Sequence, residues 1–221
     1  MTEYKKVFQE LKEASGDRNV TLVAVSKFHP YEMVMEAYAD GARIFGENRV
    51  QEMREKFPPK GKRPEGMKVY LIGQLQRNKV KKAIEWADRI ESVDSIPLID
   101  KIEKECEALG TDMEILLEFN SSGEEQKSGF CSSEELIEAA SYASGCPHIT
   151  VKGIMTIGPL GFDDEKNRRA FKRTKDLYDE LKAVYPSFTV LSMGMSGDWR
   201  TALEYESDEV RIGTAIFGER V

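Results

Sequence analysis

Short apolar runs alternate with longer segments of helical periodicity along almost the whole chain. The apolar runs that we interpret as strands are NVTLVAVS, ARIFGE, MKVYLIG, DRIESV, DMEILLEFN, ITVKGIMTI, FTVLSMG and EVRIGTAIFG. Runs this short and apolar are typical of strands buried on both faces, as in a parallel sheet. Helical patterns separate them, and several of these end on Gly or Pro, the usual helix stop signals.

The alternation predicts an α/β fold, a single (β/α)8 TIM barrel with a leading helix. Eight strand–helix units follow the amphipathic N-terminal segment MTEYKKVFQELKEASG. The length of 221 residues lies at the compact end of the range for this fold. A doubly wound open sheet is the alternative, although it usually has fewer strands. No stretch resembles a long linker, so we expect one domain over residues 1–221.

Polar residues and glycines follow the predicted strands, at the end where barrels carry their chemistry. Lys27 comes directly after the first strand. Burial in a dry cavity would favour the neutral amine of this lysine, because desolvation disfavours the ammonium. A neutral amine is the form that attacks a carbonyl carbon to make an imine. A lysine that merely ends a strand at the surface is the simpler alternative.

The segment LSMGMSGDW is the clearest candidate for anion binding. We expect Ser196 to cap a helix that starts around Gly197, so that free N–H groups and the helix dipole face an anion. Gly213 and Thr214 repeat this opportunity after the eighth strand. Barrels usually hold phosphate in these two loops. The alternative is that Ser196 only caps a helix and the glycines only form turns.

A lysine and a phosphate site in one barrel mouth suggest an aldehyde that carries a phosphate. Pyridoxal phosphate is the commonest such ligand, and a Schiff-base aldolase acting on a sugar phosphate also fits. Arg211 should point into the barrel if Ile212 packs outward. A guanidinium donates only and keeps its proton, so beside a pyridine nitrogen it would leave that nitrogen unprotonated. Alternatively, Arg211 forms an ion pair or lies at the surface.

The net charge and the cysteines indicate which partners, location and metal sites to expect. The net charge of −7 argues against nucleic acid and against an anionic membrane surface as the main partner. The basic run QRNKVKK reads as the solvated face of a helix. The cysteines are odd in number and show no metal-ligand or CxxC spacing, so we expect reduced thiols, a cytoplasmic location and no metal site. No run has the length of a membrane span.

Six segments together resemble the pyridoxal-phosphate homeostasis protein family. They are AVSK (24–27), FGENRVQE (45–52), LIGQLQRNK (71–79), KGIMTIG (152–158), LSMGMSGDW (191–199) and VRIGTAIFGER (210–220). Members of this family look like a lone alanine-racemase-type barrel. The match runs from about Val20 to Arg220, and its motifs are specific in combination.

The resemblance implies a role for each candidate residue. Lys27 falls on the imine-forming lysine, Asn48 on a residue that lines the cofactor site, and Arg211 on the partner of the pyridine nitrogen. The other implied positions are Ser196, Gly213 and Thr214 for the phosphate, and Met155 and Met193 for the ring pocket. Lys127, in the loop NSSGEEQKSGF, is a candidate secondary lysine or a solvated charge. Tyr70 replaces a histidine common in the family, and we expect no acid–base task for His29 or His148.

The family also implies a cofactor binder rather than a robust enzyme. Its members bind pyridoxal 5′-phosphate and affect vitamin B6 and, indirectly, amino-acid pools; transfer to apo-enzymes stays open. A racemase of this cofactor class uses a lysine and a tyrosine from a second domain across a dimer. The sequence ends at Val221, a few residues past the last strand, so we expect that domain to be absent and the protein to be a monomer. A racemase-like enzyme and a Schiff-base aldolase are the alternatives.

Overall fold

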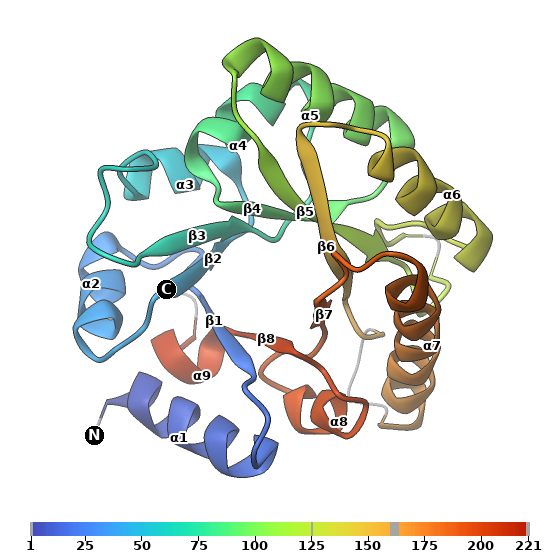
Figure 1. Cartoon of the computed structure of the whole chain (residues 1–221). Helices are drawn as coiled ribbons and strands as arrows, with labels where there is room; N and C mark the ends of the chain where they lie inside the picture. Colours follow the sequence, from blue (N-terminus) through green and yellow to red (C-terminus); the bar gives the residue numbers. More distant parts are fainter. Residues whose placement is uncertain (1, 125, 160–163, 220–221) are drawn as a thin grey trace.

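Parallel strands closed into a barrel form the centre of the molecule (Figure 1). The computed structural model describes residues 2–124, 126–159 and 164–219, and these contain eight strands, each paired with the next along the chain, with β8 closing on β1. The predicted barrel is confirmed and the open sheet is excluded. The strands are β1 (Thr21–Val25), β2 (Ile44–Glu47), β3 (Lys68–Leu71), β4 (Arg89–Val93), β5 (Met113–Phe119), β6 (Ile149–Thr156), β7 (Val190–Ser192) and β8 (Glu209–Ile212).

Helices form a ring outside the barrel, and the leading helix belongs to this ring. The helix α1 packs against α8 and α9, beside the closing strand pair β1–β8 (Figure 1). Within the described part of the chain, no helix is both long and apolar enough to cross a membrane. The helices are α1 (Glu3–Ser15), α2 (Tyr31–Ala39), α3 (Val50–Lys56), a 3-10 turn η1 (Arg77–Lys79), α4 (Val80–Trp86), α5 (Ile96–Leu109), α6 (Ser133–Ser144), α7 (Asp164–Val184), α8 (Trp199–Glu204) and α9 (Thr214–Phe217).

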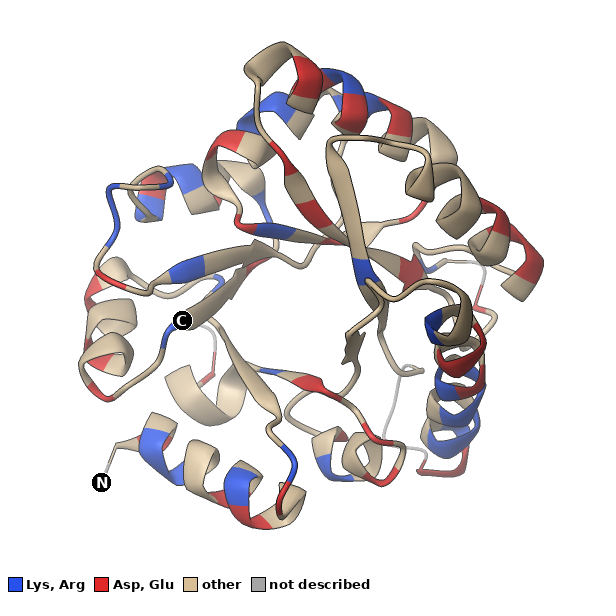
Figure 2. Cartoon of the chain, in the orientation of Figure 1, with Lys and Arg blue, Asp and Glu red and all other residues tan. Residues whose placement is uncertain are grey.

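The strands are buried on both faces, but the two faces differ in polarity. Outward-facing residues such as Phe45 and Leu117 pack in one large apolar core beneath the helices. The inner face carries a small apolar cluster on β1 and β3 and, beside it, buried charged residues. Charged positions therefore occur on strands such as β8 as well as on the outer faces of the helices (Figure 2). The apolar runs of the sequence mark mainly the outer face.

Gly153 in β6 allows two neighbouring strands to pack closely. Its φ is +149°, and a Cβ there would lie 1.8 Å from the carbonyl oxygen of Val190. The pairing of β5 with β6 shifts register between Ile115 and Leu116, beside this glycine. A side chain at this position would clash with the backbone of β7, so the barrel wall requires glycine here.

Candidate functional site

A cavity of about 370 Å³ opens at the C-terminal ends of the strands. This volume lies within the range of roughly 300–1,000 Å³ that is typical of small-molecule sites. Residues at the ends of β1 and β8, just after β2, β3 and β6, and in the loop between β7 and α8 line it, as the barrel topology predicts. The lining includes the predicted site residues Lys27, Asn48, Ser196, Arg211, Gly213 and Thr214. We call this space the mouth cavity.

Lys27 lies in a tight turn directly after β1. The amide of His29 donates to the carbonyl oxygen of Ser26 at 3.1 Å, which closes the turn around Lys27. Phe28 has a φ of +67°, an uncommon conformation for a residue with a side chain. The side chain of Lys27 is half-buried and lines the mouth cavity. Lys27 therefore belongs to an ordered turn at the cavity, and the first strand does not simply end in solvent.

Both neighbours of Lys27 are held by one buried cluster of charges. The ammonium of Lys56 donates to the carbonyl oxygen of Ser26 at 2.7 Å and to the carboxylate of Glu47 at 2.7 Å. The hydroxyl of Ser26 also donates to Glu47, at 2.7 Å. Glu52 accepts from Lys56 at 2.9 Å and from the amide of Phe28. Burial raises the pKa of the Glu47 carboxyl, so Lys56 compensates a carboxylate that would otherwise be unfavourable.

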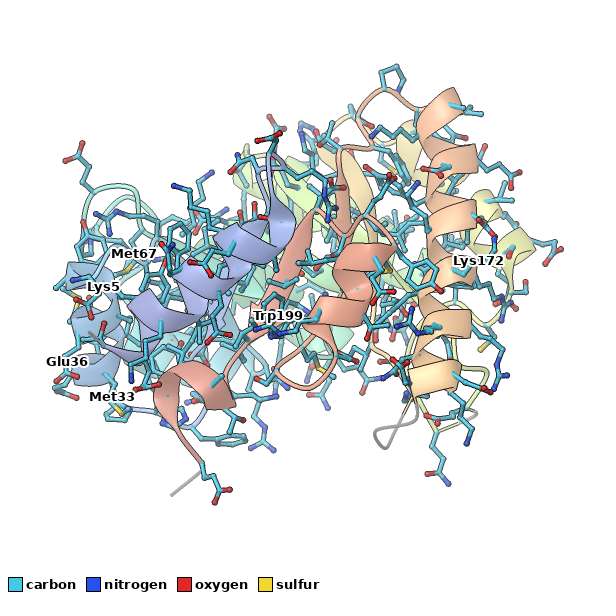
Figure 3. The ribbon with its side chains drawn as sticks, turned by 90° about the horizontal axis from the view of Figure 1, so that it is seen from below. Lys5, Met33, Glu36, Met67, Lys172 and Trp199 are labelled. Atoms are coloured by element: carbon cyan, nitrogen blue, oxygen red, sulfur yellow. The ribbon has the colours of Figure 1, made fainter. Side chains whose placement is uncertain are left out.

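The loop after β7 differs from the sequence prediction. The helix α8 begins at Trp199 (Figure 3), and its N-cap is Asp198 rather than Ser196. The carboxylate of Asp198 accepts from the amide of Met195 at 2.6 Å, and this bond fixes the loop. Ser196 is left exposed at the rim of the mouth cavity. The predicted cap was wrong because the helix begins two residues later than expected, and the N-cap residue Asp198 makes no capping hydrogen bond with its side chain.

Asp198 itself lines the mouth cavity, where a carboxylate would repel an anion. The Oδ2 atom of Asp198 lies 2.8 Å from the position that a Cβ on Gly158 would occupy. The carboxylate is therefore turned toward Gly158, at the side of the cavity formed by β6 and α7. Burial raises the pKa of Asp198, and the hydrogen bond from the amide of Met195 opposes this shift.

The start of α9 supplies hydrogen-bond donors on the same side. Gly213 is the N-cap of α9 and Thr214 is its first residue. The first amide groups of a helix have no acceptor within that helix, and the Thr214 hydroxyl adds a further donor. A Cβ on Gly213 would lie 3.0 Å from the carbonyl oxygen of Val25, so glycine allows the close contact of β8 with β1. Together with the Ser196 hydroxyl, these donors form a set that suits a phosphate.

Arg211 forms part of the floor of the mouth cavity. It is 4% exposed, and its guanidinium donates to the hydroxyl of Ser192 at 2.6 Å and to the carbonyl oxygen of Thr156 at 2.7 Å. The predicted inward orientation is confirmed. Within the described residues no ion pair to Arg211 is found, and its burial excludes a surface arginine.

Met155 and Met193 do not line the mouth cavity, contrary to the expectation for the ring pocket. Both are fully buried. Met155 pairs in register with Glu118 and Ser192, so it faces the barrel interior below the cavity. Met193 follows the inward-facing Ser192 and therefore points outward, into the core beneath the helices. Met195 lines the cavity instead.

His29 is a lining residue that the sequence analysis missed. Its ring is buried, lies in the mouth cavity and stacks on Phe217 with the ring centres 5.4 Å apart. Burial and the charge of Lys56 lower the pKa of His29, so the ring is neutral at neutral pH. Its position two residues after Lys27, within the same turn, was the available signal.

Tyr70 and Lys127 also have defined places. Tyr70 lies inside the barrel, where the Arg89 guanidinium sits 4.0 Å from the centre of its ring, and burial raises its pKa. Lys127 is half-buried and donates to the carbonyl oxygen of Gly158 at 2.7 Å. It is therefore not a solvated loop charge. Two residues of the quoted motifs, Glu125 and Arg220, lie outside the described residues.

A ladder of buried charges continues below the mouth cavity. Ser192 donates to Glu91 at 3.2 Å, and Arg89 donates to Glu91 at 2.7 Å and also to Glu209. One oxygen of Glu209 has no described partner. No group of three or more His, Cys, Asp and Glu side chains that could hold a metal ion occurs among the residues the structure describes.

The stability of the protein should depend on pH through Glu209. Burial raises the pKa of Glu209 from 4.5 to about 7, so between these values the folded state holds a proton that the unfolded state releases. The free energy of unfolding therefore falls over this interval as pH rises. Glu209→Gln should remove this part of the fall, and urea unfolding at pH 5 and pH 8 measures it. The exposed Glu107→Gln is the control; an unchanged pH dependence in Glu209→Gln would contradict the assignment.

Comparisons with known proteins give one consistent result. The family model for the alanine racemase N-terminal domain matches residues 3–221. The pyridoxal phosphate homeostasis protein of Schizosaccharomyces pombe is 36% identical over 214 residues, which cover 96% of this chain and 89% of that protein. The human protein of the same name is 41% identical over 210 residues, covering 90% of this chain and 76% of that protein.

A solved structure is similar over the same length. PipY of Synechococcus elongatus PCC7942, solved with PLP bound, has a TM-score of 0.84 to this chain at 32% sequence identity. The match covers 98% of this chain and 100% of PipY. The similarity therefore includes all the strands that surround the mouth cavity.

Proposed function

This chain belongs to the pyridoxal phosphate homeostasis protein family, and from that premise and the geometry of the mouth cavity we propose that it binds pyridoxal 5′-phosphate. We propose further that Lys27 holds the cofactor as a Schiff base and that the protein serves vitamin B6 homeostasis. An effect on amino-acid metabolism follows indirectly, because many enzymes of that metabolism use this cofactor.

One observation carries the proposal: a primary amine and a set of anion-binding donors line the same cavity. Lys27 lies on the β1 side, Gly213 and Thr214 lie at the start of α9, and Ser196 lies in the loop before α8. When bound, the cofactor supplies an aldehyde that reacts with an amine and a ring that accepts electrons. Arg211 provides a donor at the floor and Asn48 lines the wall next to Lys27. The residues present therefore fit this cofactor.

The same residues favour binding over rapid catalysis. A guanidinium donates only and keeps its proton, so a ring nitrogen held beside Arg211 would stay unprotonated and the ring would be a weaker electron acceptor. Ser196 and Thr214 are exposed, so water reaches the cavity and weakens the interactions within it. We propose a carrier without robust turnover, and racemisation at ordinary enzyme rates of about 1–1,000 per second would contradict this.

We also propose a cytoplasmic monomer that releases its cofactor to apo-enzymes. The reducing compartment is supported by the thiols of Cys106, Cys131 and Cys146, which are free. Light scattering of the purified protein tests the oligomeric state, and transfer of the cofactor to an apo-enzyme in a coupled activity assay tests the release.

An absorption spectrum tests the proposed function. Protein purified or incubated with pyridoxal phosphate should be yellow, and borohydride should bleach the band and attach the cofactor to the peptide that contains Lys27. A Schiff-base aldolase would be colourless and would be trapped by borohydride only in the presence of its substrate. Protein that stays colourless at saturating cofactor would overturn the proposal.

A further inference from the structure

A second cavity, of about 350 Å³, lies beside the mouth cavity. Ile157, just after β6, lines both spaces and forms the wall between them. The second cavity is bounded by the ends of β3 and β5 and by the loop that leads to α6. Its lining is mostly polar: Gln74, Glu118, Phe119, Asn120, Gln126, Lys127, Ser128 and Ile157.

Glu118 brings an incompletely satisfied carboxyl group to this second cavity. The side chain is 3% exposed, and its Oε1 atom accepts from the hydroxyl of Ser128 at 2.7 Å. Its Oε2 atom is buried and has no partner among the described residues. A buried acceptor without a donor is unfavourable, so this oxygen is suited to a donor from a ligand.

The surroundings of Glu118 favour a cationic donor. Burial raises the pKa of Glu118, because the carboxylate has lost most of its contact with water. An ammonium group placed there would stabilise the carboxylate and form a charge-assisted hydrogen bond. A neutral polyol would gain much less from this environment.

Lys127 supplies the opposite charge in the same cavity. Its side chain is 16% exposed, and its ammonium lies 2.7 Å from a carboxylate oxygen of Glu124 and donates to the carbonyl oxygen of Gly158 at 2.7 Å. An ammonium group has three donors, so Lys127 can donate to a ligand carboxylate as well as to Gly158. The second cavity thus presents a carboxylate and an ammonium, the complement of a zwitterion.

We propose that the second cavity binds a free α-amino acid, with its ammonium group at Glu118 and its carboxylate at Lys127. The binding is non-covalent, and neither residue is required to hold the cofactor. The inference builds on the proposed function, because it places the amino acid one side chain, Ile157, away from the cofactor. Such a site would make the cofactor carrier responsive to the amino-acid supply.

Equilibrium dialysis with L-alanine tests the inference. The loaded protein is first reduced with borohydride, so that the cofactor is fixed and cannot exchange with the added amine. We expect saturable binding of L-alanine in the millimolar range. Ethylamine and propionate, each with one of the two charged groups, should bind about tenfold more weakly, since each loses a charge-assisted hydrogen bond. No saturable binding of L-alanine would overturn the inference.

Two variants separate the roles of the charges. Glu118→Gln should weaken L-alanine binding about tenfold or more, whereas the exposed Glu107→Gln should leave it unchanged. Lys127→Gln should weaken L-alanine binding and leave ethylamine binding unchanged, which keeps the inference testable if Glu118→Gln does not fold. Equal affinity of a folded Glu118→Gln and the wild type would refute the site. The yellow colour before reduction reports cofactor binding separately. A yellow protein that does not bind L-alanine would therefore contradict the amino-acid site and leave the proposed cofactor binding intact.

Discussion

Lys27→Ala should remove the absorption band of the bound cofactor and abolish its attachment by borohydride. Lys27 is the lysine that lines the mouth cavity, and a covalent link to an aldehyde requires an amine at that place. The donors at Ser196, Gly213 and Thr214 remain in the variant, so weak non-covalent binding of the phosphate end should persist. Spectra before and after reduction, with peptide mapping by mass spectrometry, measure both effects.

Two further lysines test whether this result is specific to Lys27. Lys172→Ala is the matched control, because Lys172 lies on the outer helix α7, with its side chain 64% exposed (Figure 3). This variant should retain full colour and full labelling at Lys27. Wild-type amounts of borohydride-trapped cofactor in Lys27→Ala, on Lys127 or on any other lysine, would show that the site has been assigned to the wrong amine.

Lys56→Met should destabilise the protein by about 3–5 kcal/mol, because it leaves the buried carboxylate of Glu47 without its cation. The side chains of Lys56 and Glu47 are 7% and 0% exposed, with Nζ and Oε1 2.7 Å apart. The same substitution frees the carbonyl oxygen of Ser26, so the turn that carries Lys27 should loosen. We expect a lower urea midpoint at pH 7 and less cofactor trapped at Lys27 under native conditions.

A surface ion pair of the same spacing provides the comparison. Lys172 and Asp176 are four residues apart, like Glu52 and Lys56, but their side chains are 64% and 63% exposed. Exposed pairs of this kind contribute about 0.3–0.5 kcal/mol, so Lys172→Met should barely change the midpoint. If Lys56→Met lowers it no further than Lys172→Met does, the charge cluster beneath the turn is not a stabilising element.

The fold could be predicted because each strand packs against helices on its outer face. That face needs apolar side chains, which mark runs such as the one that becomes β5, whereas turns and helix caps mark the segments between strands. The polar inner face was less visible. Arg89 on β4 pairs with Glu91 on its own strand and with Glu209 on β8 across the barrel, and the partner on β8 can be recognised only once the strands are in place.

The site was predictable where it depends on strand ends and alternation. Lys27 follows a strand directly, and Arg211 alternates with the outward-facing Ile212, so both side chains lie at the mouth cavity as expected. The alternation also places Met193 outside the barrel, which the resemblance alone did not reveal. Lys56 could not be found in this way, because it contacts Ser26 across 30 residues of chain.

The mouth cavity draws on the first strand and the last one, and this has a consequence for the newly made polypeptide. Lys27 leaves the ribosome early, whereas Arg211, Gly213 and Thr214 emerge near the end of synthesis. A ligand that needs both sets cannot be captured until β8 has joined β1. Whatever binds there also stabilises the seam by mass action. Ligand binding therefore requires a closed barrel and disfavours separation of β8 from β1.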